Sequence, residues 1–233
     1  MVTPIIIICL GALTVFWFLF EKIKAYSLKA AFIKAVASLL FISLATYNFY
    51  KSDLRIFPMF AVIALSLGML GDIALDLKYV FREKDYEFTV AGFVVFGLGH
   101  ILYMTGMFLE FYHDQNALYI IIPLILAVIM GPVTLFIGRL SKVRYGRFKW
   151  IALIYAMTLF GTTFTAFSLW VMTSFANTGL LMLFIGGVLF AVSDLILNLT
   201  YFGVGHEKPF DIISNTVTYY AAQFIIALSI LFI

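Results

Sequence analysis

Long apolar stretches are the feature of this sequence that most limits the folds open to it. A helix needs ~20 residues to cross the hydrocarbon core of a bilayer, and stretches of about this length recur along the whole chain. A helix is the expected form because it satisfies its own backbone hydrogen bonds in lipid. We expect helical spans at residues 4–20, 30–50, 56–77, 88–111, 117–137, 150–172, 178–203 and 212–233.

Composition supports a membrane protein and excludes a soluble globular domain. Hydrophobic residues make up 64% of the 233 residues and charged residues only 12%, far from the balance of soluble proteins. The loops between the spans leave no room for a separate soluble domain. The sequence therefore predicts an all-α integral membrane protein, with one bundle of eight transmembrane helices and short loops forming a single domain over residues 1–233. We expect a multi-pass location, in the cell (inner) membrane if the source is bacterial.

Lysine and arginine in the loops predict the orientation of the bundle. The connections 21–29, 78–87, 138–149 and 203–211 hold most of these residues, whereas the opposite side holds Lys51 and Arg55. Basic loops stay in the cytosol as a rule. We therefore expect both termini on the outer side. The basic run in 138–149 lies between two spans, so it indicates topology rather than a nucleic-acid partner.

Polar side chains inside four of the spans fall in the same half of the membrane. With a rise of ~1.5 Å per residue, Asp72 lies ~8 Å from the cytosolic end of its span, Tyr219 ~11 Å, Asp194 ~14 Å, Gln223 ~17 Å and His100 ~18 Å. The spans alternate in direction, so composition alone does not force this agreement. We expect one polar cavity, open toward the cytosol and walled by the third, fourth, seventh and eighth spans.

Within each span the polar residues also share a face, because residues three or four apart stack on one side of a helix. These sets are Asp72 with Asp76, Asp194 with Asn198, His100 with Tyr103, and Asn215 with Tyr219 and Gln223. A single Ser, Tyr or Gln in a span most often links helices. A charged side chain is different, because it costs roughly 2.5–3.5 kcal/mol at the bilayer centre. Two intramembrane aspartates on separate helices therefore point to a functional site.

Two carboxylates facing one cavity suit acid–base chemistry. One can remain a neutral acid while the other carries the charge, as in the cleavage of acetal-like bonds through oxocarbenium ions. Which aspartate is the acid stays open. Ser193 is a weaker nucleophile candidate, because it directly precedes Asp194 and points ~100° away from it on a helix. Asp72, His100 and Asp194 form a conceivable metal site without a compact motif, and we expect neither a metal nor another cofactor.

Four segments together resemble a known membrane enzyme family. They are LGMLGDIAL at 67–75, FVVFGLGHILYM at 93–104, GGVLFAVSDLILNL at 186–199 and TVTYYAAQFII at 216–226. In order and spacing they are similar to the YhhN-like lysoplasmalogenases, multi-span enzymes that hydrolyse the vinyl ether bond of lysoplasmalogens. Lys34 resembles a lysine early in the second span of that family, although the proline that commonly follows it there is Ala35 in this chain.

The resemblance implies a substrate and products. The substrate is a lysophospholipid, 1-alkenyl-glycerophosphoethanolamine or the choline analogue, which enters from the membrane lipids. The products are a fatty aldehyde and a glycerophospho-alcohol. We expect Asp72 and Asp194 to be catalytic. The expected supporting or substrate-binding residues are Lys34, Asp76, His100, Tyr103, Ser193, Asn198, Tyr219 and Gln223.

Other functions remain open at the level of sequence. A proton-coupled transporter also uses intramembrane Asp and His residues, but it predicts polar groups across the whole membrane and internal repeats. A metal-dependent hydrolase of another lipid bond predicts several histidines grouped within the spans. A receptor-like or structural membrane protein is the third alternative.

Overall fold

Long helices account for nearly all of the structure, a computed structural model that describes residues 2–53, 55–113, 116–203 and 208–233. The eight α-helices are α1 (Val2–Lys24), α2 (Leu28–Lys51), α3 (Ile56–Val80), α4 (Asp85–Phe111), α5 (Leu118–Leu140), α6 (Lys149–Met172), α7 (Thr178–Phe202) and α8 (Pro209–Ser229). Three single turns of 3-10 helix accompany them, η1 (Arg82–Lys84), η2 (Gly146–Phe148) and η3 (Ile230–Phe232). Within these ranges there is no strand, and all eight long helices are apolar enough to cross a membrane. The predicted fold class is confirmed.

Six of the eight helices are longer than the apolar stretches that predicted them, whereas α7 and α8 are each one residue shorter. Most clearly, α1 continues to Lys24, four residues past the expected end. Long basic side chains can reach toward polar surroundings from the end of a membrane helix, so they need not interrupt it. The prediction that Lys22 belongs to a connecting loop is therefore wrong: it lies in the last turn of α1.

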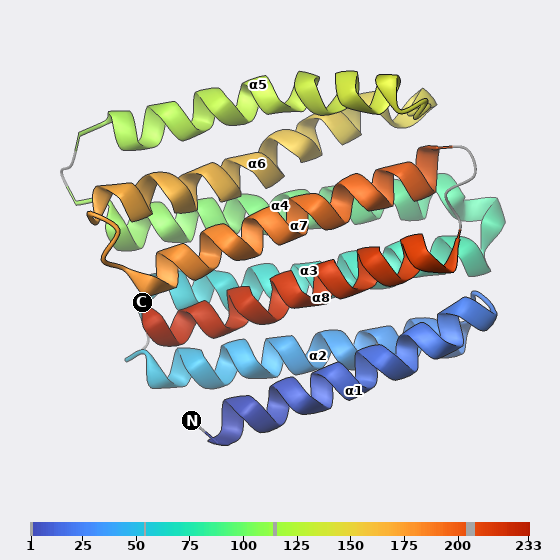
Figure 1. Cartoon of the computed structure of the whole chain (residues 1–233), viewed down its shortest axis with the longest axis horizontal. Helices are drawn as coiled ribbons and strands as arrows, with labels where there is room; N and C mark the ends of the chain where they lie inside the picture. Colours follow the sequence, from blue (N-terminus) through green and yellow to red (C-terminus); the bar gives the residue numbers. More distant parts are fainter. Residues whose placement is uncertain (1, 54, 114–115, 204–207) are drawn as a thin grey trace.

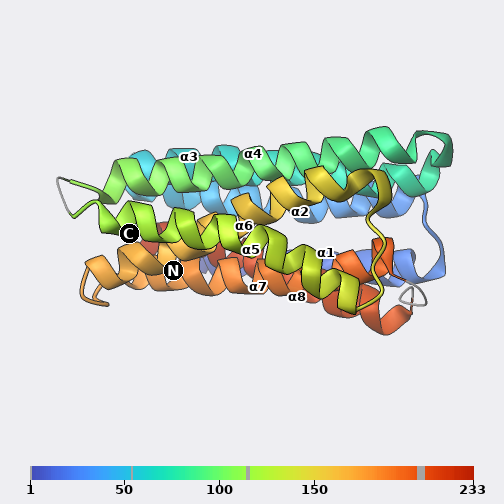
Figure 2. The ribbon, with the colours of Figure 1, turned by 90° about the horizontal axis from the view of Figure 1, so that it is seen from above.

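The helices lie side by side, with their connections gathered at two ends of the bundle (Figure 1). Seen from above, α2, α3 and α4 form one side, and α1, α7 and α8 lie opposite them (Figure 2). The peripheral helices are α1 and α5, each with only 22% of its most apolar segment buried. One large cluster of buried side chains runs through the centre and includes Phe41, Leu65, Leu169, Leu180 and Tyr220. These side chains come from α2, α3, α6, α7 and α8, so these helices meet inside the bundle.

Local sequence signals fix where three of these helices begin. Ser27 caps α2, where its hydroxyl accepts a hydrogen bond from the Ala30 amide at 3.2 Å. Asn177 caps α7 in the same way, accepting from the Leu180 amide at 2.9 Å. Pro209 opens α8, at a position where the missing amide proton costs nothing. Capping satisfies amides that the first turn leaves unpaired.

An acidic residue of α4 holds the start of α3. The Glu110 carboxylate accepts hydrogen bonds from the amides of Ile56 and Phe57 at 2.9 and 3.2 Å, and it pairs with Arg55 at 2.8 Å. A negative charge is favourable at the N-terminus of a helix. Glu110 is thus used to fix α3, the helix that carries Asp72, against its neighbour α4.

The basic residues of the predicted topology gather at one end of the bundle. The described connections α1–α2, α3–α4 and α5–α6 meet at the end opposite both termini (Figure 1). The last turn of α7 and the first turn of α8 lie at the same end, and residues 204–207 between them lie outside the described ranges. The side of the membrane that this end faces stays a prediction from the charge bias.

Cysteine labelling will test this orientation. Cys9 is the single cysteine, so Cys9→Ser gives a background in which Ser141→Cys and Ala176→Cys each place one thiol at an exposed position at opposite ends. With a membrane-impermeant maleimide on intact cells, we expect labelling at position 176 and none at 141 until the membrane is permeabilised. The reverse pattern would place the basic end outside.

The packing of α3 against α4 makes a second prediction. A Cβ on Gly106 would lie 2.6 Å from the Phe60 Cβ, whereas a Cβ on Gly97 would find its nearest atom, the Thr158 hydroxyl oxygen, at 3.7 Å. Gly106→Ala should therefore destabilise the protein by about 1–3 kcal/mol through overpacking. Gly97→Ala, on the same helix, should be neutral or stabilising because alanine favours helix. Thermal unfolding in detergent compares the two, and equal stability would contradict this packing.

Candidate functional site

A cavity in the bundle lies between the two aspartates singled out by the sequence. It contains ≈ 700 Å³ of empty space, including the part open to the surroundings, and Asp72 of α3 and Asp194 of α7 both line it. Both carboxylates are buried, with 2% and 7% of their residue surface exposed. The lining also includes Lys22, Lys34 and Tyr155. Helices α1, α2 and α6 therefore contribute walls beyond the four predicted spans.

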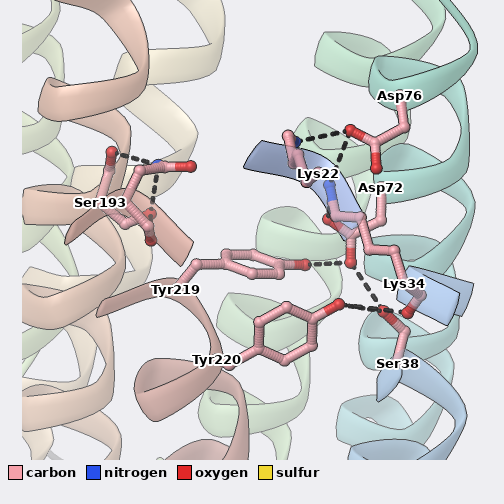
Figure 3. A network of polar contacts seen from close by, with 9 residues as sticks. Lys22, Lys34, Ser38, Asp72, Asp76, Ser193, Tyr219 and Tyr220 are labelled. Atoms are coloured by element: carbon pink, nitrogen blue, oxygen red, sulfur yellow. Dashed lines mark hydrogen bonds and ion pairs between the residues drawn. The ribbon is translucent and has the colours of Figure 1, made fainter. Parts of the chain in front are cut away.

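Asp72 is surrounded by hydrogen-bond donors. Its Oδ2 accepts hydrogen bonds from the hydroxyls of Tyr219 at 2.8 Å and Ser38 at 2.9 Å, and its Oδ1 lies 3.2 Å from the Lys34 ammonium. Figure 3 shows Tyr219 of α8 reaching this carboxylate, while the neighbouring Tyr220 reaches Ser38. One ammonium and two hydroxyls compensate the loss of water around a buried carboxylate. The surroundings of Asp72 therefore suit its charged form.

Asp76 lies one helical turn closer than Asp72 to the basic end of the bundle, and it forms ion pairs with two lysines. Its Oδ1 lies 2.9 Å from the Lys22 ammonium and 3.6 Å from the Lys34 ammonium. Asp76 does not belong to the cavity lining, whereas both lysines do. Charges thus alternate from α1 to α3 in the order Lys22, Asp76, Lys34 and Asp72 (Figure 3).

Asp194 has a much poorer set of partners. It accepts a hydrogen bond from the Tyr155 hydroxyl of α6, and no basic side chain in the described ranges forms an ion pair with it. Burying a charged carboxylate without a cation is costly. Its surroundings therefore suit a neutral carboxylic acid, in contrast to those of Asp72.

Ser193 and Asn198 also reach the cavity, but Ser193 is engaged in helix packing. Its hydroxyl donates to the Asn215 carbonyl at 3.1 Å, and the Asn215 amide donates to the Ser193 carbonyl and hydroxyl oxygens at 2.8 and 2.9 Å. These bonds join α7 to α8 beside Asp194. Such links between membrane helices are the common use of small polar residues.

Four predicted residues lie outside the cavity lining: Asp76, as described above, and His100, Tyr103 and Gln223. The imidazole Nδ1 of His100 lies 3.2 Å from the Thr162 hydroxyl. Phe190 packs against both the His100 ring, at 4.9 Å, and the Tyr219 ring, at 5.3 Å. The Phe190 ring therefore stands between His100 and the residues around Asp72. Depth alone could not predict this separation.

Sequence reasoning missed three residues of the site. Ser38 is four residues from Lys34 and shares its helix face, so its position carried a usable signal. Lys22 looked like one more basic residue at the end of a span. Tyr155 is an unremarkable tyrosine in an apolar helix, and only the packing of α6 on α7 brings its hydroxyl to Asp194.

The acidic and histidine side chains do not converge as metal ligands. In the part of the chain that the structure describes, no three His, Cys, Asp or Glu side chains come together as a group that could hold an ion. Asp72, His100 and Asp194, the triad considered from sequence, are therefore not such a group.

Comparison with protein families gives a match over most of the chain. A model described as the YhhN family matches residues 29–230. No curated protein and no solved structure matches the chain significantly.

The buried pair of Lys34 and Asp72 predicts a characteristic stability pattern. Lys34→Met removes the cation and should destabilise the protein by about 3–5 kcal/mol, because it leaves a buried charge unpaired. The double variant Lys34→Met/Asp72→Asn should recover most of that loss, since Asp76 keeps Lys22. Lys29→Met removes an exposed partner of Glu21 and should change little. Thermal unfolding measures all three, and a double variant no more stable than Lys34→Met would contradict a charged pair.

Proposed function

The chain belongs to the YhhN family, and we propose that it is a lysoplasmalogenase. The reaction is hydrolysis of the vinyl ether bond of a single-chain 1-alkenyl glycerophospholipid, which gives a fatty aldehyde and a glycerophospho-alcohol. The observation that carries this proposal is that Asp72 and Asp194 face one cavity from different helices with unlike partners.

The unlike partners support a different role for each carboxyl group. Asp194, with one hydroxyl donor and no paired cation, is the general acid. Asp72, held by an ammonium and two hydroxyls, is the carboxylate that stabilises positive charge and accepts a proton from water. Pairs of carboxyl groups whose surroundings favour opposite protonation states are the usual basis of such chemistry.

The reaction begins with proton transfer from Asp194 to the β-carbon of the vinyl ether. The electrons of the carbon–carbon double bond form the new C–H bond. The α-carbon and the ether oxygen are left as an oxocarbenium ion. The Asp72 carboxylate stabilises this cation electrostatically. Water then adds to the α-carbon, and its proton passes to Asp72, so that a neutral hemiacetal results.

Collapse of the hemiacetal restores both groups. The hemiacetal hydroxyl returns its proton to Asp194 as the carbonyl forms, and Asp72 protonates the departing glycerol oxygen. The bond between the former vinyl carbon and that oxygen breaks, releasing aldehyde and alcohol. Protons balance over the cycle, and one water is consumed.

The direct test is aldehyde release by the purified protein from lysoplasmalogen. Asp72→Asn and Asp194→Asn should each lower the rate by about 10²–10⁴-fold, the usual contribution of a general acid or base. Glu87→Gln, which removes an exposed acidic residue near the same end of the bundle, should keep the full rate. Normal turnover by either aspartate variant would contradict the proposed roles.

A chelator and a second substrate separate the alternatives. Undiminished activity with chelator supports the metal-free acid–base scheme, and loss of activity with chelator favours a metal-dependent hydrolase. Absence of aldehyde under all conditions, in protein shown to be folded by its thermal unfolding, would refute the lysoplasmalogenase proposal. The saturated alkyl-ether analogue should not be cleaved, because it has no double bond to protonate.

A further inference from the structure

Two lysines line the cavity beside the proposed reaction centre. Lys22 of α1 and Lys34 of α2 are the only basic residues among those described that line it. Both side chains are largely buried, each with 12% exposed. Burying two long cationic side chains in a membrane protein costs free energy, so their presence at a cavity wall calls for an explanation beyond topology.

Asp76 holds the two ammonium groups next to each other from behind. Both contact its Oδ1, while Asp76 itself is not part of the cavity lining. The two lysines, rather than the carboxylate between them, therefore belong to the cavity wall. An ammonium group has three N–H donors, and Lys22 spends one on the hydrogen bond to Asp76. Donors remain for an anion in the cavity.

The position of the pair matches the geometry of a lysophospholipid. Lys22 lies in the last turn of α1, at the depth where lipid headgroups meet the end of a span. Lys34 lies 3.2 Å from Asp72, so an anion bound between the lysines is adjacent to the proposed reaction centre. In a single-chain glycerophospholipid the vinyl ether and the phosphate are attached to opposite ends of the three-carbon glycerol.

We propose that Lys22 and Lys34 form a phosphate-binding subsite in the cavity, which anchors the phosphodiester of a lysophospholipid headgroup with its ether bond near Asp72. The identity of this ligand rests on the proposed function. The contribution of Lys22 does not follow from the family match, because that match begins at residue 29. In this scheme Lys22 does more than pair with Asp76, because its remaining N–H donors bind the ligand.

A binding experiment tests the subsite without relying on catalysis. The probes are a saturated 1-alkyl glycerophosphoethanolamine, which has the phosphate but no cleavable bond, and the matching 1-alkylglycerol, which lacks the phosphate. Affinity for each is measured with purified protein in detergent. Lys22→Gln should weaken binding of the phospholipid about tenfold or more, the usual effect of losing a hydrogen bond to a charged group, and should leave alkylglycerol binding unchanged.

Matched variants guard against a structural explanation. Lys22→Arg should keep most of the phospholipid affinity, and Lys24→Gln should keep all of it, because Lys24 is exposed on the same helix. If Lys22→Gln does not fold, the double variant Lys22→Gln/Asp76→Asn removes one charge of each sign and tests the same loss. Equal weakening for both ligands, or no weakening for the phospholipid, would overturn the proposal.

Two further measurements are needed. One distinguishes free phosphate from a lipid headgroup as the ligand, and the other tests the subsite independently of the proposed activity. Competition by inorganic phosphate that depends on Lys22 would assign the subsite to free phosphate as well, whereas no competition would assign it to the lipid headgroup alone. Binding that depends on Lys22 in a protein that releases no aldehyde would support the subsite and refute the lysoplasmalogenase activity.

Discussion

A buried carboxylate in a membrane bundle must find compensating partners, and this requirement organises the centre of the molecule. Asp72 meets it with Lys34, Ser38 and Tyr219, which come from α2 and α8. Each of these bonds also holds a helix, so the same contacts that compensate the charge fix α2, α3 and α8 around the cavity. Asp194 meets the requirement differently, with a single hydroxyl donor from α6. The two carboxyl groups in the cavity wall therefore have unlike surroundings, one suited to a charged carboxylate and the other to a neutral acid.

The lysines extend this charge arrangement to the rim of the bundle. Lys22 joins the peripheral helix α1 to Asp76 at 2.9 Å, although little of α1 is buried. The link therefore gives α1 a specific contact with the site. The charges of Lys22, Asp76, Lys34 and Asp72 alternate in sign and balance one another, and all of these residues except Asp76 line the cavity. A polar wall of this kind beside apolar rings such as Phe93 and Phe96 suits a ligand with one charged and one apolar end.

Much of the candidate site could be predicted from the sequence, for reasons that differ from residue to residue. The two aspartates were found because a charged side chain in lipid is costly. Tyr219 was found because it shares a helix face with other polar residues. Lys22 was misassigned because its neighbours in sequence are charged, which is also the pattern of a loop. His100 was expected in the cavity because its depth is similar, but rotation about the α4 axis directs it to Thr162 of α6.

The sequence by itself determined the fold class, the approximate spans and the position of each polar group along its helix, because hydrophobicity and helical rise act along a single chain. It also determined the family, through motifs in a fixed order. Only the tertiary structure decided which side chains meet. The donation from Tyr155 to Asp194 and the bridging of two lysines by Asp76 join residues far apart in sequence. Such contacts depend on which faces the packed helices present to one another, and no local pattern encodes that choice.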